Sequence, residues 1–307
     1  MSNPTGTILI TGGSGLIGKL LTYRLQTKGY AVRWLVRNPA SAPVPAFRWS
    51  VEHGYLDPAA LNGVQAIIHL AGENLGGGRW TEARKRQLLE SRTRSTALLA
   101  KKLKEIPNHV NTVLSASAIG YYGDRPDGEI MTETSPSGDD FLAQITREWE
   151  AAADAMAAPG RRVVKVRIGI VLSADGGALK ELARPVKWLV GSPLGSGDQV
   201  MSWIHEQDLA DIFLHLLQHQ ETQGVYNAVA PAPVTNRELV RGIARVLKRP
   251  ILLPPVPAFM LRFLLGEMAV MVLAGSRVSG EKIQATGYHF RFTELHEALR
   301  DIFHKAG

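Results

Sequence analysis

The chain has 307 residues, of which 45% are hydrophobic and 21% charged, so it can bury a full core and does not have the composition of a disordered protein. It contains no cysteine, which excludes disulfides, thiolate catalysis and cysteine-ligated zinc, and which is compatible with a reducing, cytoplasmic environment. Its net charge of +7 raises the question of a nucleic-acid partner.

The first motif in chain order is a strand, a glycine turn and a helix. Ile8–Ile10 is apolar, the glycines follow with the spacing G-x-x-G-x-x-G, and Lys19–Lys28 is compatible with a helix. The free N–H groups and positive end of such a helix suit a dinucleotide pyrophosphate, whereas a purely structural turn is the alternative. Gly12 permits the turn, Gly15 lets the phosphate approach, and Gly18 lets helix and strand pack closely. The residues expected at the cofactor are Gly12, Gly13, Ser14, Gly15, Leu16, Ile17 and Gly18.

The next strand indicates which nucleotide binds. Residues Ala31–Val36 are extended by composition and end at Arg37. NAD-preferring enzymes usually carry an acidic residue here, which bonds the ribose 2′-hydroxyl, whereas a guanidinium can grip the 2′-phosphate of NADP. We therefore expect NADP as the cofactor, the alternative being that Arg37 is merely a solvated residue at the end of the strand.

The positive charge is local. Residues 79–104 contain nine basic and two acidic residues, and the stretch from Trp80 to Ala100 has the pattern of one long amphipathic helix. A solvated basic helix face explains this surplus, and no DNA- or RNA-recognition motif occurs elsewhere, so no nucleic-acid partner is expected. Arg92 on this helix either turns inward, to the nicotinamide ribose or the substrate, or faces water.

Apolar strand-like runs alternate with helical stretches along the first half of the chain. After the first two strands, further runs are expected at Ala66–Leu70, Val110–Ala116 and Val163–Val171. This alternation predicts an α/β fold of the Rossmann type, a doubly wound parallel sheet with both faces covered. Ligands of such sheets bind beyond the carboxyl ends of the strands. The cofactor residues expected there are Leu70, Ala71, Gly72, Ser115 and Val171.

The sequence changes character after residue 172. We expect residues 1–172, completed by parts of 200–230, to form the NADP-binding domain, with 173–199 and 231–307 as a smaller, discontinuous C-terminal substrate lobe. The apolar stretch Ile251–Ser276 is interrupted by three prolines, Arg262 and Glu267, so we interpret it as buried helix and loop rather than a membrane span. No membrane partner is therefore expected, and the sequence indicates no particular oligomeric state.

Several of these segments resemble a known family. They are Thr11–Gly18, His69–Gly72, Ser115–Gly123, Arg167–Leu172 and Trp203–Asp208. Together they are similar to extended short-chain dehydrogenases/reductases, and more narrowly to the sugar-nucleotide-epimerase-like family often labelled cell-division-inhibitor-like. Three further segments resemble the domain of unknown function that ends this family: Gly266–Met268, Ser276–Val278 and Ala285–Tyr288. The resemblance covers essentially the whole chain and implies fold and cofactor, but little about the substrate.

The resemblance also implies a mechanism, but this sequence contains only part of the catalytic residues that the mechanism needs. In the superfamily a tyrosine exchanges a proton with the substrate, a lysine four residues later lowers its pKa, and an upstream serine orients the substrate. Ser117 matches the serine, with Ser115 as a substitute, but the tyrosine position corresponds to Phe141 and the lysine position to Ile145. Tyr121 and Tyr122 follow Ser117 closely. The catalytic candidates are therefore Ser117, Tyr121 and Tyr122; packing aromatics are the alternative.

The remaining polar candidates have structural interpretations. His215 and His219 have helical spacing but no third ligand, so no metal site is expected, and Asp139 or Asp140 is better explained as a helix cap. His205 and Asp208 are expected in a structural turn. The sequence thus predicts an NADP-dependent oxidoreductase or epimerase-like enzyme acting on a small substrate, nucleotide-linked or not. The alternative is a non-catalytic NADP(H)-binding regulator, which the missing tyrosine–lysine pair favours.

Overall fold

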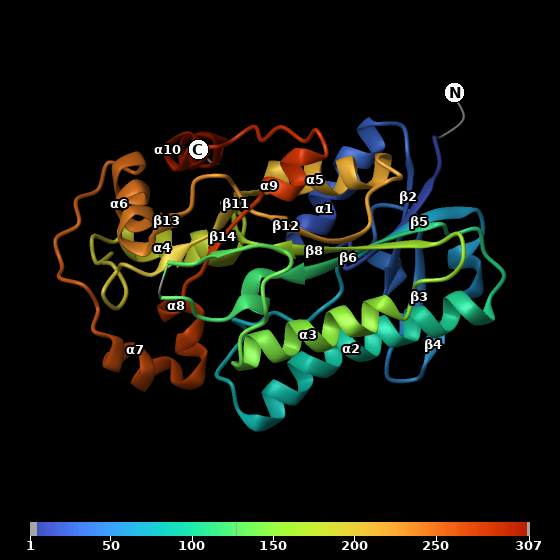
Figure 1. The fold of residues 1–307 in the computed structure, drawn as a ribbon, viewed down its shortest axis with the longest axis horizontal. Coiled ribbons are helices and arrows are strands. Elements are labelled where there is room, and N and C mark those ends of the chain that lie inside the picture. Colours follow the sequence, from blue (N-terminus) through green and yellow to red (C-terminus); the bar gives the residue numbers. More distant parts are fainter. Residues whose placement is uncertain (1–4, 127, 306–307) are drawn as a thin grey trace.

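An eight-stranded sheet forms the centre of the computed structural model, which describes residues 5–126 and 128–305 (Figure 1). The strand order is β12-β8-β6-β5-β1-β2-β3-β4, and all neighbours are parallel except β3 and β4. The strands are β1 (Thr7–Thr11), β2 (Ala31–Val36), β3 (Ala46–Ser50), β4 (Tyr55–Leu56), β5 (Val64–His69), β6 (Thr112–Ala118), β8 (Arg162–Ile168) and β12 (Gly224–Ala228). The order runs outward from β1 in both directions, which confirms the doubly wound α/β fold.

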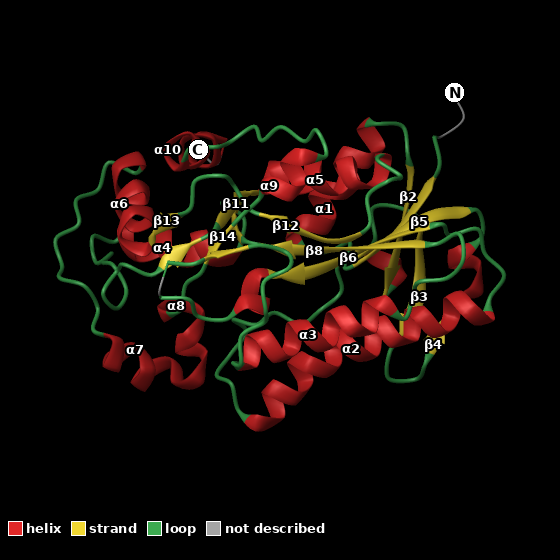
Figure 2. Ribbon diagram, viewed as in Figure 1, coloured by secondary structure: helices red, strands yellow, loops and turns green. Residues whose placement is uncertain are grey.

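Helices cover both faces of this sheet (Figure 2). Helix α1 (Leu16–Thr27) packs with α5 (Glu206–Gln218) on one face, and the long α2 (Glu82–Glu105) packs with α3 (Phe141–Asp154) on the other. Alternate residues of β1 enter different cores, because Ile8 and Ile10 pack with the α1 and α5 side while Leu9 packs with the α2 side. This two-sided burial explains why the central strands read as near-continuous apolar runs.

The expected strand Val163–Val171 is wrong as a single element. The chain breaks at Gly169, so that β8 stays in the main sheet while β9 (Ile170–Leu172) pairs with β11 (Trp203–His205) in a separate ribbon. A Cβ at residue 169 would lie 2.7 Å from the carbonyl oxygen of Ser202, so glycine allows these two segments to approach. Val171 consequently lies outside the main sheet.

The C-terminal part of the chain packs around a core of its own. This core lies between α4 (Gly177–Lys187), α6 (Asn236–Val246) and α10 (Leu295–Lys305) and includes Leu179, Trp203 and Leu239. Other short elements are β7 (Ile130–Met131), β10 (Val200–Met201), β13 (Val234–Thr235), β14 (Arg277–Val278), α9 (Glu281–Ala285), and the 3-10 turns Pro39–Ser41, Pro58–Leu61, Ile119–Tyr122 and Gly266–Ala269. Strand β14 pairs with β7, so the end of the chain returns to the middle of the Rossmann segment.

The apolar stretch Ile251–Ser276 forms loop, α7 (Ala258–Leu265) and α8 (Val270–Leu273). The expectation that its helix is buried is wrong, because only Leu261 of α7 is buried while Phe259 and Phe263 are 71% and 82% exposed. Among the residues that the structure describes, no helix combines the length and apolar character needed to cross a bilayer.

Candidate functional site

The glycine turn lies between β1 and the N-terminus of α1. Gly12 has a φ of +70°, a conformation that glycine adopts readily, and a Cβ on Gly18 would lie only 2.3 Å from the carbonyl oxygen of Gly12. The two roles assigned to these glycines, turn and close packing, are therefore confirmed. Gly15 is the N-cap of α1 and has no side chain to cap it, and no acidic residue follows in the first turn. The first N–H groups of α1 and its positive end can therefore receive an anion.

A buried histidine joins this turn to the segment after β5. The Thr11 hydroxyl oxygen accepts the N–H groups of Leu70 and Ala71 at 3.1 and 3.2 Å, so its own hydrogen is donated to His69 Nδ1 at 2.7 Å. His69 Nε2 then donates to Thr96 Oγ1 at 2.9 Å, and Thr96 donates to the carbonyl of Arg92 at 2.6 Å. One neutral imidazole thereby fixes the ends of β1 and β5 to α2.

This arrangement predicts a specific pH dependence of stability. Burial lowers the pKa of His69 to about 4 from a usual 6.5, so the folded protein does not take up the proton that the unfolded chain binds below pH 6.5. The free energy of unfolding is therefore expected to fall by about 3 kcal/mol between pH 6.5 and 4 through this residue alone. Urea unfolding should show a weaker pH dependence in His69→Asn, and parallel curves for the two proteins would contradict the assignment.

Arg92 turns inward from α2, as one of the two alternatives predicted. Its side chain is buried, its Nη1 and Nη2 donate to the carbonyls of Leu88 and Glu73 at 2.9 Å, and its guanidinium lies 5.3 Å from the centre of the Trp149 ring. Burial lowers the pKa of Arg92 to about 10, so it remains charged at neutral pH. A Cβ on Gly72 would lie 3.3 Å from this guanidinium, which shows how tightly Arg92 packs against the segment after β5.

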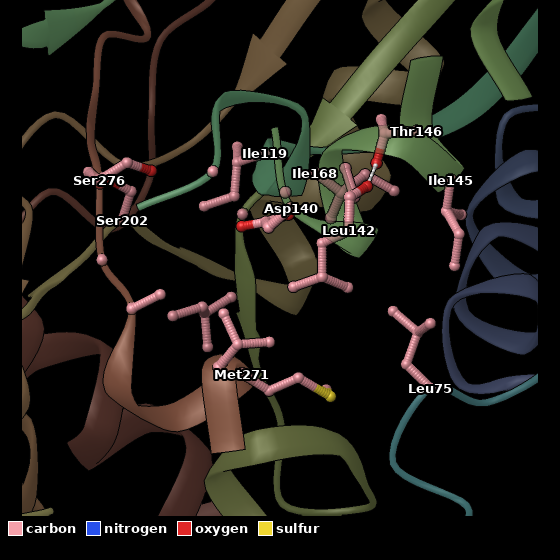
Figure 3. A pocket seen from close by; sticks show the side chains of 18 of the residues that line it. Leu75, Ile119, Asp140, Leu142, Ile145, Thr146, Ile168, Ser202, Met271 and Ser276 are labelled. Atoms are coloured by element: carbon pink, nitrogen blue, oxygen red, sulfur yellow. Dashed lines mark hydrogen bonds between the residues drawn. The ribbon is translucent and has the colours of Figure 1, made fainter. Parts of the chain in front are cut away.

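A cavity of about 280 Å³ opens beyond the carboxyl ends of β6 and β8 (Figure 3). Apolar side chains form most of its wall, from Leu75, Ile119 and Leu142 on the Rossmann side to Val270 and Met271 of α8. Its polar side chains are Arg92, Asp140, Thr146, Ser202 and Ser276. Residues 118–120 and 168–170 form the floor where a doubly wound sheet binds its ligand, so this cavity is the candidate substrate site.

Residues of α3 on the cavity wall show which side chains occupy the region where a catalytic tyrosine and lysine were sought. Phe141 packs against Trp80 with ring centres 5.2 Å apart, whereas Leu142, Ile145 and Thr146 line the cavity. Two pairs with the four-residue spacing lie on the cavity wall, Leu142 with Thr146 and Ile145 with Trp149. Thr146 donates its hydroxyl hydrogen to the Leu142 carbonyl at 2.7 Å. Neither pair supplies a tyrosine and a lysine, so the departure from the superfamily pattern remains.

Ser117 and Tyr122 lie in a buried polar network beneath the cavity. Ser117 donates to Glu150 Oε1 at 2.6 Å, Arg167 Nε and Nη2 donate to the two oxygens of Glu150 at 2.8 and 2.9 Å, and Arg167 Nη1 donates to the Tyr122 hydroxyl at 3.0 Å. Tyr122 in turn donates to Asn227 Oδ1 at 2.7 Å. Neither hydroxyl lines the cavity. Both are engaged with protein groups, which favours a positioning role over direct proton transfer.

The charges of this network have opposite effects on its pKa values. Burial raises the pKa of Tyr122, although the adjacent Arg167 acts to lower it. Burial acts to lower the pKa of Arg167, but its hydrogen bonds and attraction to Glu150 outweigh this and leave it above the usual value. Tyr121 is half-buried, and the Arg167 guanidinium lies 3.4 Å from its ring centre. Tyr122 therefore remains a neutral phenol and Arg167 a cation at neutral pH.

The other predicted residues take varied positions. Arg37 is exposed at the carboxyl end of β2, Ser115 is buried in β6, and Val171 is half-buried in β9. Asp140 caps α3 by accepting the N–H of Ala143 at 2.8 Å, as expected.

The histidines singled out in the sequence pack against or hydrogen-bond to other protein groups. His215 and His219 stack on each other with ring centres 3.8 Å apart, and among the described residues no group of three or more possible metal ligands occurs. His205 caps α5 by accepting the N–H of Gln207, and Asp208 accepts hydrogen bonds from Tyr288, Arg291 and Phe292. Both residues therefore have structural roles, but the expected turn is absent, because β11 passes directly into α5 and Asp208 lies within the first turn of that helix.

Sequence reasoning missed two parts of this site. One is Glu150, the carboxylate that forms an ion pair with the buried Arg167. The sequence could have indicated it only as a charged residue on the buried side of the helix that became α3. Val270, Met271 and Ser276 close the cavity from a part of the chain at least a hundred residues away from its floor. Their contribution follows from the packing of the C-terminal lobe and has no local motif.

Comparison with known proteins identifies relatives of this chain. Residues 8–228 match the NAD dependent epimerase/dehydratase family, and residues 256–302 match a domain of unknown function, DUF1731. The chain is 36% identical to epimerase family protein SDR39U1 of Mus musculus, across 96% of this chain and 99% of that protein. It is 37% identical to the chloroplastic SDR39U1 homolog of Arabidopsis thaliana, across 96% and 86%.

A solved structure supports the same relationship. The crystal structure of human SDR39U1 (isoform 2) with NADPH superposes with a TM-score of 0.87 at 34% identity, and the alignment covers 96% of this chain and 98% of that one. The similarity to human SDR39U1 covers nearly the whole chain. It therefore includes the glycine turn, the doubly wound sheet and the C-terminal lobe. The chain belongs to the NAD-dependent epimerase/dehydratase family, in the branch of SDR39U1-type proteins that end in the domain of unknown function.

Proposed function

We propose that this protein binds NADP(H) and acts as an oxidoreductase or epimerase-like enzyme on a small carbonyl or hydroxyl compound. The observation that carries the proposal is the cavity, which lies at the carboxyl end of the same sheet whose first turn offers an anion site. A relative of 34% identity has been crystallised with NADPH. Cavity walls that are mainly apolar, with a few polar side chains, favour a substrate that carries its carbonyl or hydroxyl on a largely apolar body. The cytoplasmic location remains a prediction.

The free N–H groups at the start of α1 fit the pyrophosphate of the cofactor, and we assign its other parts to the remaining expected residues. Residues Gly12–Gly18 would hold the pyrophosphate, Arg37 the 2′-phosphate, and Leu70–Gly72 with Ser115 and Val171 the middle of the molecule. Arg92 would bind the nicotinamide ribose or the substrate. When bound, NADP(H) supplies the hydride-transfer chemistry. The chain itself binds, orients and excludes water through the apolar cavity wall.

The alternative proposal, a non-catalytic NADP(H)-binding regulator, is favoured by one observation. The tyrosine position of the superfamily corresponds to Phe141 and the lysine position to Ile145, and none of the described residues that line the cavity is a tyrosine or a lysine. A phenylalanine cannot exchange a proton, and an isoleucine carries no charge to lower a neighbour's pKa. Screening carbonyl compounds with NADPH separates the proposals, because turnover of any of them supports the enzyme and its complete absence supports the regulator.

Arg37 gives a direct test of the cofactor proposal. We expect NADPH to bind more tightly than NADH, and Arg37→Asp to reverse this order, because a charge-assisted contact contributes a factor of about 10 to 150 in affinity. Calorimetry with both cofactors measures the ratio. Lys28→Asp, a charge reversal at the far end of α1, is the matched control and should leave the ratio unchanged. Equal affinities in the unaltered protein would refute the role of Arg37.

The loop after β6 gives a test of the proton source. The Tyr121 hydroxyl forms no hydrogen bond with the described residues, whereas the hydroxyls of Ser117 and Tyr122 are engaged, and none of these three residues lines the cavity itself. We therefore expect Tyr121→Phe to slow turnover about a hundredfold at unchanged stability. Ser117→Ala and Tyr122→Phe should instead lower the melting temperature. If the rate of Tyr121→Phe equals that of the unaltered enzyme, the loop only shapes the cavity.

A further inference from the structure

The largest exposed apolar side chains of the C-terminal lobe lie on three segments that are close together. The first is Trp188–Val190, directly after α4, and the second is Leu252–Leu253, before α7. Ser192 Oγ donates to the backbone carbonyls of Leu253 and Pro254, and the N–H of Val256 donates to the backbone carbonyl of Pro193. The chain after the first segment therefore runs beside the second segment. The third is α7, which is separated from the second segment only by residues 254–257. We call this surface the tip surface.

Helix α7 turns its apolar side toward solvent. Phe259, Met260, Phe263 and Leu264 occupy one face of the helix and are all exposed, whereas Leu261 on the other face is buried. Trp188 is 75% and Leu252 is 67% exposed. Figure 1 shows α7 and the loop that precedes it at the end of the molecule farthest from β2. Groups of exposed apolar side chains of this kind are typical of surfaces that bind a partner or a membrane.

The charge around the tip surface is mainly positive. Segments 181–190 and 245–267 contain two exposed acidic residues, Glu181 and Glu267, and six exposed basic residues, which are Arg184, Lys187, Arg245, Lys248, Arg249 and Arg262. A second copy of the chain docked through the same surface would bring these cations together, which disfavours a symmetric dimer. The complementary partner is anionic and accepts aromatic side chains, and a helix lying flat at the interface of an anionic bilayer meets both requirements.

We propose that the tip surface binds the surface of membranes that contain anionic lipids, with α7 and Trp188 entering the interface and the six cations facing the headgroups. This proposal replaces the sequence-based expectation that the protein has no membrane partner. It is independent of the proposed enzyme activity, because none of the residues that define the tip surface lines the substrate cavity.

Vesicle sedimentation tests the proposal. The protein should sediment with vesicles of equal parts phosphatidylcholine and phosphatidylglycerol, should bind phosphatidylcholine alone much more weakly, and should dissociate as salt is raised. Phe259→Ser/Phe263→Ser should weaken binding at least about tenfold. Arg249→Glu/Arg262→Glu should weaken it more than fivefold per charge, and only on the anionic vesicles. The matched control is Tyr23→Ser, which removes an aromatic side chain that is 64% exposed on α1, and it should bind normally.

Tryptophan fluorescence reports the orientation. Trp188 is 75% exposed, while the other five tryptophans are at most 7% exposed, so brominated lipids should quench Trp188 alone and Trp188→Phe should abolish the quenching. Unaltered thermal unfolding of each variant shows that its fold is intact. Absence of binding to anionic vesicles overturns the proposal. So does a dimer, detected by light scattering, that dissociates in Phe259→Ser/Phe263→Ser, because a second copy would then cover the tip surface.

Discussion

Replacing Gly15 by Val is expected to abolish NADP(H) binding and to leave the protein folded. Gly15 is the N-cap of α1 and has an extended backbone with φ −73° and ψ 172°, which any residue can adopt. A Cβ built there meets only the Gly12 carbonyl oxygen, at 3.2 Å, and the residue is exposed. The valine methyl groups would then fill the space directly before the first N–H groups of the helix, where the pyrophosphate has to approach.

The neighbouring Gly18 provides the contrast. A Cβ there would lie 2.3 Å from the carbonyl oxygen of Gly12 and 2.6 Å from the Cα of Gly13, so Gly18→Ala has to move backbone and should cost about 1–3 kcal/mol of stability. Thermal unfolding with and without NADPH distinguishes the two variants. Gly15→Val should melt near the unaltered protein and show no shift with NADPH, whereas Gly18→Ala should melt lower. A normal NADPH-induced shift in Gly15→Val would contradict the assignment of the phosphate turn.

The elements that could be predicted from the sequence are those specified by patterns of neighbouring residues. The glycine turn, the apolar run of β1 and the amphipathic pattern of α2 each specify an element from neighbouring residues alone. The break at Gly169 could not be read in this way, since Ile168 and Ile170 continue the apolar run and only the distant Ser202 carbonyl explains the glycine. Similarly, the apolar composition of α7 is the same for a buried and for an exposed helix, so its environment had to come from the structure.

The same distinction holds for the site. Because ligands bind at the carboxyl ends of parallel strands, the sequence could place residues 70–72 and the loop after Ser117 near the site. It could not show that the Ser117 hydroxyl is taken up by Glu150, which is 33 residues away, nor that α8 closes the cavity. These contacts depend on how α3 and the C-terminal lobe pack on the sheet, and no spacing in the sequence encodes that packing.

The largest loss of stability is expected from Glu150→Ala. Glu150 and Arg167 are both buried, with 8% and 3% of their side chains exposed, and Arg167 is held by both oxygens of the carboxylate. Removal of Glu150 leaves a guanidinium in the core without its counter-charge, which should cost about 3–5 kcal/mol in the free energy of unfolding. Ser117→Ala, which removes only the neutral donor to the same carboxylate, should cost about 1 kcal/mol.

A double variant separates the charge from the packing. Glu150→Ala/Arg167→Met removes both charges, so urea unfolding should find it more stable than Glu150→Ala alone, although it has lost more hydrogen bonds. A loss below about 1 kcal/mol in Glu150→Ala would show that water reaches Arg167 and that the pair is not structural. The pair joins α3 to β8, and Thr146 and Ile168, on the same two elements, both line the cavity (Figure 3). Its loss should therefore loosen the cavity as well as the core, and NADPH should stabilise Glu150→Ala less than the double variant.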